Sequence, residues 1–119
     1  MELQARARRE SFCYLTTTGR RSDRPHTIEI WFGIAGDRLY MLSGGGERAD
    51  WVRNLLAHPE VGVRVGGQEF SGRAEVVQDG EEDAMARKLL AAKYQDWRQG
   101  EPLSSWARTA LPVAVDLRS

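Results

Sequence analysis

The chain has 119 residues, of which 41% are hydrophobic and 29% are charged. These proportions are typical of a folded globular domain and exclude the fibrous and disordered classes. Seventeen basic residues balance seventeen acidic residues, so the net charge gives no reason to expect nucleic acid as a partner. We therefore predict one domain over residues 1–119, built around one hydrophobic core.

The first part of the chain predicts three strands. Residues 2–10 are good helix formers and predict a short lead-in helix or a frayed end. Aromatic and β-branched residues predict a strand over residues 11–18. Alternation predicts one strand over residues 27–34, and a glycine turn then leads to a third strand over residues 38–43. The core face of the second strand carries Ile28, Ile30, Phe32 and Ile34.

Helical spacing of apolar residues predicts a helix over residues 47–58, which Pro59 closes. Alternating apolar residues then predict two strands, residues 61–65 and 70–76, which form a second hairpin around a pair of glycines.

Asp79 and Glu82 have the spacing of a capping box and predict the longest helix, which extends through about Trp97. Its expected inner stripe consists of Met85, Leu89, Leu90 and Ala92. A short segment around Trp106 follows. Residues 112–117 predict a last strand, with Val113, Val115 and Leu117 inward.

The predicted elements amount to five or six strands with two or three helices inserted between hairpins, so the sheet must be mainly antiparallel. In a chain this short, regular strands tend to close into a barrel, which removes their unpaired edges. We predict a mainly β, α+β fold: a small antiparallel barrel with a helix lying against it.

Cys13 is the only cysteine, so the chain cannot form an internal disulfide or a cysteine-rich zinc site. Its apolar surroundings favour inert packing over a reactive thiol. His26 and His58 are not spaced as a metal pair, and we expect no metal. The first residues lack the pattern of a signal peptide, and no stretch approaches the ~18 apolar residues of a membrane span. We expect a cytoplasmic protein.

Three arginines, Arg20, Arg21 and Arg24, lie within five positions of the turn that follows the first strand. An anionic ligand would explain this concentration of charge, because guanidinium groups offer paired donors that match phosphate and carboxylate oxygens. The alternative is a solvated surface turn whose arginines pair with Asp23 or Glu29. The turn alone leaves both interpretations open.

A second segment suited to anions, Ser43 followed by three glycines, precedes the helix over residues 47–58. Glycines let a ligand approach the backbone, and the N-terminus of a helix favours negative charge. The alternative is a flexible connection between strand and helix. Because both segments follow strands, they favour a joint site.

Aromatic residues offer two further candidates. Trp51 and Asn54 are three residues apart on the helix that follows the glycines, and Trp51 is a core or rim anchor by residue type. Tyr94 and Trp97 have the same spacing and would wall a pocket for a flat ligand, although such pairs on an amphipathic helix usually serve packing.

Three motifs lie in a characteristic order: Tyr-Leu-Thr-Thr-Thr-Gly-Arg-Arg-Ser with Arg-Pro over residues 14–25, Ser43-Gly-Gly, and Asp-Trp-Val-Arg-Asn-Leu-Leu-Ala-His-Pro over residues 50–59. Together they resemble the deazaflavin-dependent nitroreductase family of the split β-barrel flavin and deazaflavin oxidoreductases. The resemblance implies a split β-barrel of the flavin-binding type and the 8-hydroxy-5-deazaflavin coenzyme. It places these residues near the coenzyme: Thr17, Thr18, Gly19, Arg20, Arg21, Ser22, Arg24, Ser43, Gly44, Gly45, Trp51 and Asn54.

The resemblance also implies an oxidoreductase that passes hydride from reduced deazaflavin to a quinone, a nitro compound or an activated alkene. The arginine turn and the Ser-Gly-Gly loop would hold the phosphate and acidic tail of the coenzyme. Such chemistry requires no side-chain nucleophile, and the catalytic residues stay unknown. Tyr94 and Trp97 are the candidate substrate residues.

Two residues depart from the family pattern. Asp23 stands where the family often has Gly, which places a carboxylate inside the expected anion site, and His26 stands where many members have Arg or Lys. Alternative interpretations are the same fold with FMN, and a non-catalytic carrier for a lipid or a hydrophobic cofactor. If Trp31 or Trp106 is exposed, it would support a homodimer.

Overall fold

One curled, antiparallel sheet organises the computed structural model, which describes residues 5–118. In this part of the chain the strands are β1 (Cys13–Thr18), β2 (Pro25–Ile30), β3 (Gly33–Ala35), β4 (Arg38–Ser43), β5 (Glu60–Val65), β6 (Gln68–Val76) and β7 (Leu111–Arg118). Their order in the sheet is β2-β1-β5-β6-β7-β4-β3. The antiparallel α+β fold is confirmed, with seven strands in place of the predicted five or six.

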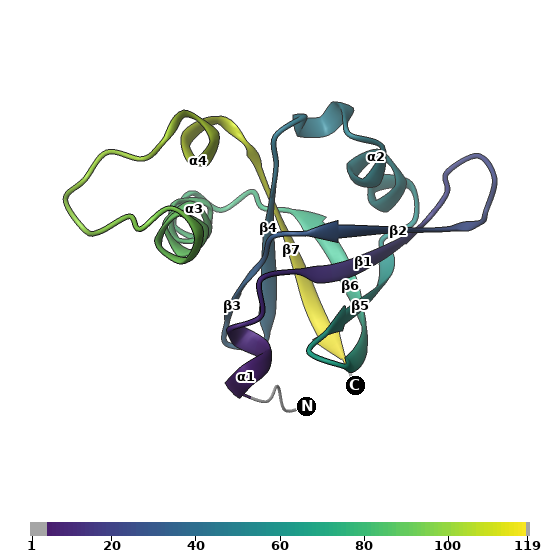
Figure 1. The fold of residues 1–119 in the computed structure, drawn as a ribbon. Coiled ribbons are helices and arrows are strands. Elements are labelled where there is room, and N and C mark those ends of the chain that lie inside the picture. The colour runs from purple at the N-terminus through teal and green to yellow at the C-terminus, as the bar shows by residue number, and fades with distance from the viewer. Residues whose placement is uncertain (1–4, 119) are drawn as a thin grey trace.

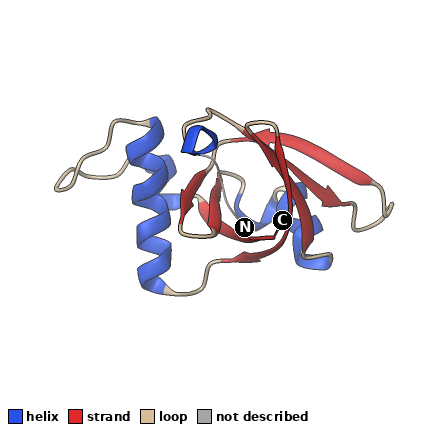
Figure 2. Cartoon of the chain, turned by 90° about the horizontal axis from the view of Figure 1, so that it is seen from below, coloured by secondary structure: helices blue, strands red, loops and turns tan. Residues whose placement is uncertain are grey.

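The sheet curls until its two edges approach each other. β2 and β3 are the edge strands, and only Trp31 and Phe32 lie between them in the chain. Three Cα–Cα steps therefore separate Ile30 from Gly33, and they span at most about 11 Å. The edges must meet at this corner, which produces the curled, split barrel in Figures 1 and 2.

The helices of the described chain are α1 (Ala5–Arg8), α2 (Asp50–Ala57), α3 (Gly80–Tyr94) and α4 (Ser105–Thr109), with a short 3-10 helix, η1 (Gly46–Arg48), before α2. This exceeds the two or three that were predicted. The lead-in helix is confirmed by α1, although residues 2–4 of that prediction lie outside the described residues. No helix within residues 5–118 has both the length and the hydropathy to cross a membrane.

Two hydrophobic clusters flank β4 and β7, where the sequence predicted one core. Leu39 and Met41 belong to the cluster inside the curled sheet, to which α2 contributes. Tyr40, Leu42 and Ala114 belong to the cluster on the opposite face, which α3 and α4 cover. The alternation of side chains along a strand lets these two strands serve both clusters.

The strand predicted over residues 27–34 is wrong as a single element, because it breaks at Trp31 and Phe32. The backbone of Phe32 bonds to α3 in place of a neighbouring strand. Its N–H donates to the Tyr94 hydroxyl at 2.9 Å, and its carbonyl oxygen accepts from Lys93 Nζ at 3.0 Å. Two side chains from a distant helix therefore turn the chain from one edge of the sheet to the other.

The capping box predicted for α3 is half formed. Asp79 accepts a hydrogen bond from the N–H of Glu82 at 2.8 Å, but the Glu82 carboxylate binds Arg38 and Tyr40 instead of returning to Asp79. The helix ends at Tyr94, three residues before the predicted end, and Asp96 then takes a left-handed φ of 53°. The inner face is also shifted: Ala86, Leu90 and Ala91 are buried, Met85 and Leu89 are partly buried, and Ala92 is exposed.

Candidate functional site

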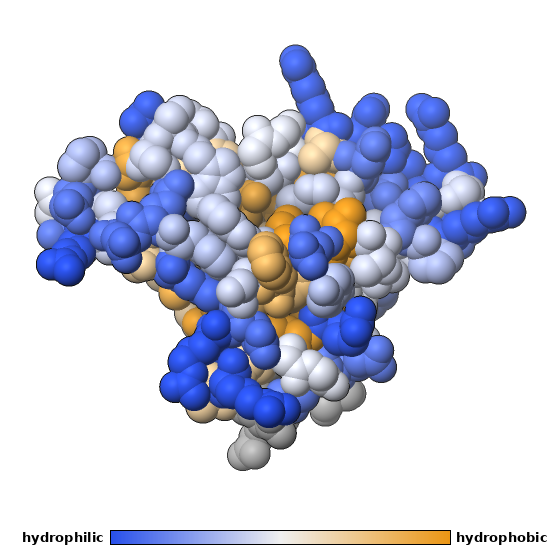
Figure 3. Space-filling view, in the orientation of Figure 1, coloured by the Kyte–Doolittle hydropathy of each residue, from blue (hydrophilic) through white to orange (hydrophobic). Residues whose placement is uncertain are grey.

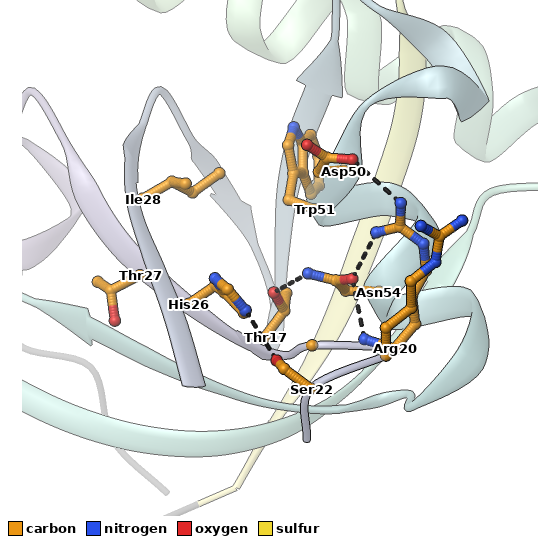
Figure 4. Close-up of a pocket in the computed structure, with 11 residues that line it drawn as sticks. Thr17, Arg20, Ser22, His26, Thr27, Ile28, Asp50, Trp51 and Asn54 are labelled. Atoms are coloured by element: carbon orange, nitrogen blue, oxygen red, sulfur yellow. Dashed lines mark hydrogen bonds and ion pairs between the residues drawn. The ribbon is translucent and has the colours of Figure 1, made fainter. Parts of the chain in front are cut away.

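A pocket of about 520 Å³ lies between the arginine turn, defined as residues 19–24, and helix α2. Strand β1 supplies its floor at Thr17, and β2 supplies one wall (Figure 4). The lining residues are Thr17, Gly19, Arg20, Arg21, Ser22, His26, Thr27, Ile28, Asp50, Trp51 and Asn54.

Backbone hydrogen bonds close the arginine turn. Gly19 N donates to the carbonyl oxygen of Arg24 at 2.8 Å, and Asp23 N donates to that of Gly19 at 2.9 Å. A Cβ atom on Gly19 would lie 2.5 Å from Ser22 Oγ and 2.7 Å from His26 Nε2, so a larger residue here would have to displace these two side chains. Asp23 has a left-handed φ of 59°, a conformation that glycine adopts more readily.

Asn54 ties this turn to α2. Its Nδ2 donates to Thr17 Oγ1 at 3.2 Å, while its Oδ1 accepts from the backbone N–H of Arg20 at 3.2 Å and from Arg20 Nη1 at 2.9 Å (Figure 4). Asn54 and Thr17 are 5% and 1% exposed, so water cannot replace these partners easily. The Asn54 side chain therefore holds the site together from within.

Arg20 is also paired with an acid of the chain itself. Its Nη2 donates to Asp50 Oδ1 at 3.2 Å, and the Asp50 side chain is 85% exposed. The partners expected for a solvated turn were Asp23 and Glu29. Asp23 lies instead 3.6 Å from His58 Nε2, and Glu29 accepts from the Tyr14 hydroxyl at 3.0 Å.

Arg21 differs from Arg20, because within residues 5–118 no hydrogen bond or ion pair engages its guanidinium group. Arg21 is exposed and lines the same pocket. Ile28 on β2 lies opposite Trp51 on α2 (Figure 4), and Arg21 belongs to the lining of the same pocket. The arrangement suits a flat ligand that carries a negative group.

The structure brings together seven of the twelve residues placed near the coenzyme: Thr17, Gly19, Arg20, Arg21, Ser22, Trp51 and Asn54. The other five, Thr18, Arg24, Ser43, Gly44 and Gly45, do not line this pocket. Ser43 is 2% exposed and donates through Oγ to the carbonyl oxygen of Gly46 at 2.9 Å. Gly44 lies instead beside the Trp106 ring.

Four of the eleven lining residues are not among the twelve: His26, which was named in the sequence only as a departure from the family pattern, and Thr27, Ile28 and Asp50, which were not placed at the site. Ile28 was assigned to the core, and it is indeed packed against the core while part of it faces the pocket. Asp50 directly precedes Trp51 in the third motif, which was the available signal.

A second, more apolar hollow of about 490 Å³ lies further along β2. Its lining residues are Phe12, Glu29, Ile30, Trp31, Leu42, Gln95 and Trp106. Ile28 lines the first pocket and Ile30 lines the second, so two side chains from the same side of β2 take part in the two linings. In the space-filling view, apolar side chains gather over β2 at the centre of this face, and hydrophilic ones project around the arginine turn (Figure 3).

Trp31 joins the second hollow to α3. Its ring is stacked on Tyr94 at 4.3 Å between centroids, and it meets the Trp106 ring edge-on at 5.4 Å. Tyr94 thus lies behind Trp31 and outside the lining of the hollow. Trp97 lines a different hollow, where its Nε1 donates to the carbonyl oxygen of Glu101 at 2.8 Å. The two candidate substrate residues are therefore not brought into one pocket.

Three ionisable groups near the Trp31–Phe32 connection have shifted pKa values. Burial lowers the pKa of Lys93 to about 8 and raises the pKa of Tyr94 to about 12. Burial also raises the pKa of Cys13 to about 12, which keeps its thiol protonated and unreactive. Among the described residues, no group of three or more His, Cys, Asp or Glu side chains could hold a metal ion.

Comparison with known proteins decides the family of this chain. The family model for the F420H(2)-dependent quinone reductases matches residues 3–118. The chain belongs to this family. An F420H(2)-dependent quinone reductase of Mycobacterium tuberculosis H37Rv is 33% identical over 109 residues, an alignment that covers 85% of this chain and 68% of that protein.

Solved structures agree with the split-barrel fold. An F420H2-dependent reductase has a TM-score of 0.70 at 19% identity, with coverage of 89% of this chain and 94% of that chain. HutZ, the heme storage protein of Vibrio cholerae, has a TM-score of 0.74 at 17% identity, with coverage of 96% and 87%. At these identities the likeness establishes the fold alone.

Membership of the F420H(2)-dependent quinone reductase family confirms the resemblance found in the sequence. The family is one of deazaflavin-dependent oxidoreductases, and its coenzyme is F420, the 8-hydroxy-5-deazaflavin. The individual coenzyme-contacting residues stay predictions.

Proposed function

We propose that this chain binds reduced F420 in the pocket between the arginine turn and α2, and that it passes hydride to a quinone or a similar electron-poor acceptor. One observation supports this proposal most strongly. Arg21, whose guanidinium group has no partner among residues 5–118, lines one pocket together with Ile28, and Ile30 on the same strand lines a separate hollow with Trp31 and Trp106. An anionic coenzyme and an apolar acceptor would find complementary surfaces side by side.

The residues of the first pocket fit such a coenzyme. Its volume of about 520 Å³ is that of a small-molecule site. Trp51 and Ile28 offer apolar walls to a flat ring, and Arg21 offers donors to the phosphate or the acidic tail. Asp23 is absent from the lining and lies beside His58 at 3.6 Å, which supports anion binding despite this departure from the family pattern.

The coenzyme, when bound, supplies the hydride. The chain supplies position: Arg21 would hold the negative group, and the ring would lie between Trp51 and Ile28, where these side chains exclude water. The aromatic hollow at Trp31 and Trp106 would admit an apolar acceptor next to the ring. No step requires a side chain as a nucleophile.

Titration of the protein into F420, followed by the quenching of coenzyme fluorescence, tests the proposal. We expect saturable binding, together with reduction of a soluble quinone when reduced F420 is supplied. Arg21→Ala should weaken binding at least about tenfold, because a charge-assisted hydrogen bond is lost. Arg24→Ala provides the matched control, since Arg24 belongs to the same turn but does not line the pocket.

Absence of saturable F420 binding by the wild-type protein would overturn the proposal. An FMN titration run in parallel detects the alternative coenzyme, and tighter binding of FMN than of F420 would also contradict it. If both coenzymes fail and an apolar ligand co-purifies in native mass spectrometry, the carrier interpretation replaces the enzyme.

We also propose a cytoplasmic homodimer. Phe12 and Trp31 are 43% and 38% exposed, which supports an association surface. One structural relative, with a TM-score of 0.70 at 22% identity, is a domain-swapped dimer. Light scattering coupled to size exclusion tests the proposal, and a mass near 13.4 kDa across a range of concentrations would contradict it.

A further inference from the structure

Asp50 occupies an unusual place for an acid in a pocket that is proposed to bind anions. It is the first residue of α2, where a carboxylate is favoured by the helix dipole. It also lines the pocket, with Oδ1 at 3.2 Å from Arg20 Nη2 (Figure 4). One of the two pocket arginines thus already has an anionic partner supplied by the chain itself.

Arg20 does not depend on Asp50 for its position. Asn54 Oδ1 accepts from both the backbone N–H and Nη1 of Arg20, at 3.2 and 2.9 Å. The Asp50 side chain is 85% exposed, and an exposed ion pair of this kind contributes little to stability. Asp50 is therefore dispensable for building the site, and its carboxylate remains a negative charge at the place where an anion would bind.

We propose that Asp50 is a specificity-determining residue that limits how tightly the pocket holds the anionic part of its ligand. It competes with that part for Arg20 Nη2 and repels it through its own charge. This proposal rests on the proposed function. A coenzyme that has delivered its hydride must be reduced again by another reaction before it can act again, so it must leave the pocket. Moderate affinity of the pocket for the phosphate and acidic tail would favour release of the used coenzyme and binding of a reduced one.

The test compares Asp50→Asn with Glu81→Gln as the matched control. Glu81 lies in the first turn of α3, so both changes remove one exposed negative charge from the start of a helix, but Glu81 does not line the pocket. Two probes are titrated: F420, and the same deazaflavin ring with its ribityl chain but without the phosphate and acidic tail. Dissociation constants and release rates are measured at about 20 mM and at about 1 M salt, which bracket weak and strong screening.

We expect Asp50→Asn to bind F420 about three- to tenfold tighter than the wild-type protein at low salt, with correspondingly slower release. The gain should shrink at high salt, because screening weakens exposed charges. The ring without phosphate and tail should bind the two proteins equally, and Glu81→Gln should match the wild type with both probes.

Unchanged or weaker F420 binding by Asp50→Asn, with normal binding by the wild type, would overturn the role of Asp50 and leave the proposed function standing. Equal tightening for both probes would overturn it as well, since the effect would then concern the ring and not the anion. Failure of the wild type to bind F420 would overturn the proposed function itself, and the role of Asp50 with it.

Discussion

Replacing Asn54 with alanine should both destabilise the fold and weaken coenzyme binding. The change removes three hydrogen bonds that join the arginine turn and β1 to α2. It leaves the Thr17 hydroxyl, which is 1% exposed, without its partner. A buried polar group that loses its partner costs about 1–3 kcal/mol, and the bonds to Arg20 add to this. We expect the free energy of unfolding to fall by about 2–4 kcal/mol.

Urea denaturation measures this loss, and the midpoint of thermal unfolding should fall by about 10 °C for a chain of this length. F420 binding should also weaken, because the turn that carries Arg21 is no longer held against α2. A loss of stability below about 1 kcal/mol would refute the reasoning, since the Asn54 network would then not hold the site.

Asn54→Asp tests the effect of an added negative charge while the hydrogen bonds at this position are kept. An aspartate keeps the acceptor for Arg20, and the Thr17 hydroxyl can rotate to donate to it, so all three contacts survive in a new pattern. We expect a smaller loss of stability than for alanine, but weaker F420 binding, because a second carboxylate then faces Arg20. If Asn54→Asp binds F420 as tightly as the wild type, electrostatic competition at Arg20 is unimportant.

Two further predictions concern the fold. Gly72→Ala should destabilise the protein by about 2 kcal/mol or more in urea denaturation, because the new Cβ would lie 2.5 Å from Val115 Cγ1. Gly80→Ala is the control, because a Cβ at Gly80 meets open space. Equal stability of the two variants would contradict the prediction for Gly72. Burial lowers the pKa of Lys93 from its ordinary 10.5 to about 8, so the unfolded state binds more protons between these values and stability rises with pH there. Between pH 8 and 9 the free energy of unfolding should rise with pH in the wild type and stay flatter in Lys93→Met. Above this range the trend is opposed by Cys13, whose thiol keeps its proton in the folded state. Equal slopes of unfolding free energy against pH in the two proteins would contradict the lowered pKa of Lys93.

Most of the strands could be predicted from the sequence because alternation is a local signal. The hairpin of β5 and β6 and the last strand, β7, lie where the pattern of valines placed them. The break at Phe32 could not be predicted, because its cause is not local. Tyr94 and Lys93 supply the partners of the Phe32 backbone from about sixty residues away in the chain.

The candidate site was predictable where it depends on one turn and one helix. Arg21, Trp51 and Asn54 lie together because the motifs that contain them end β1 and form α2. The glycines after Ser43 do not lead directly into α2. They lead into the 3-10 helix η1, so α2 begins only at Asp50. The Asp50 carboxylate therefore lies at the N-terminus of α2, where the sequence had predicted an anionic ligand.

Strand β2 links the two halves of the proposed reaction. Ile28 and Ile30 are two residues apart, which corresponds to about 7 Å along a strand, so neighbouring parts of β2 line the pocket proposed for the coenzyme and the aromatic hollow. Hydride transfer needs the reacting atoms about 3–3.5 Å apart, so we expect ring and acceptor to meet over this stretch. Tyr94 stacks on Trp31 and bonds to the Phe32 backbone, so in the proposed reaction it would act as a positioning residue that fixes one wall of the aromatic hollow from behind.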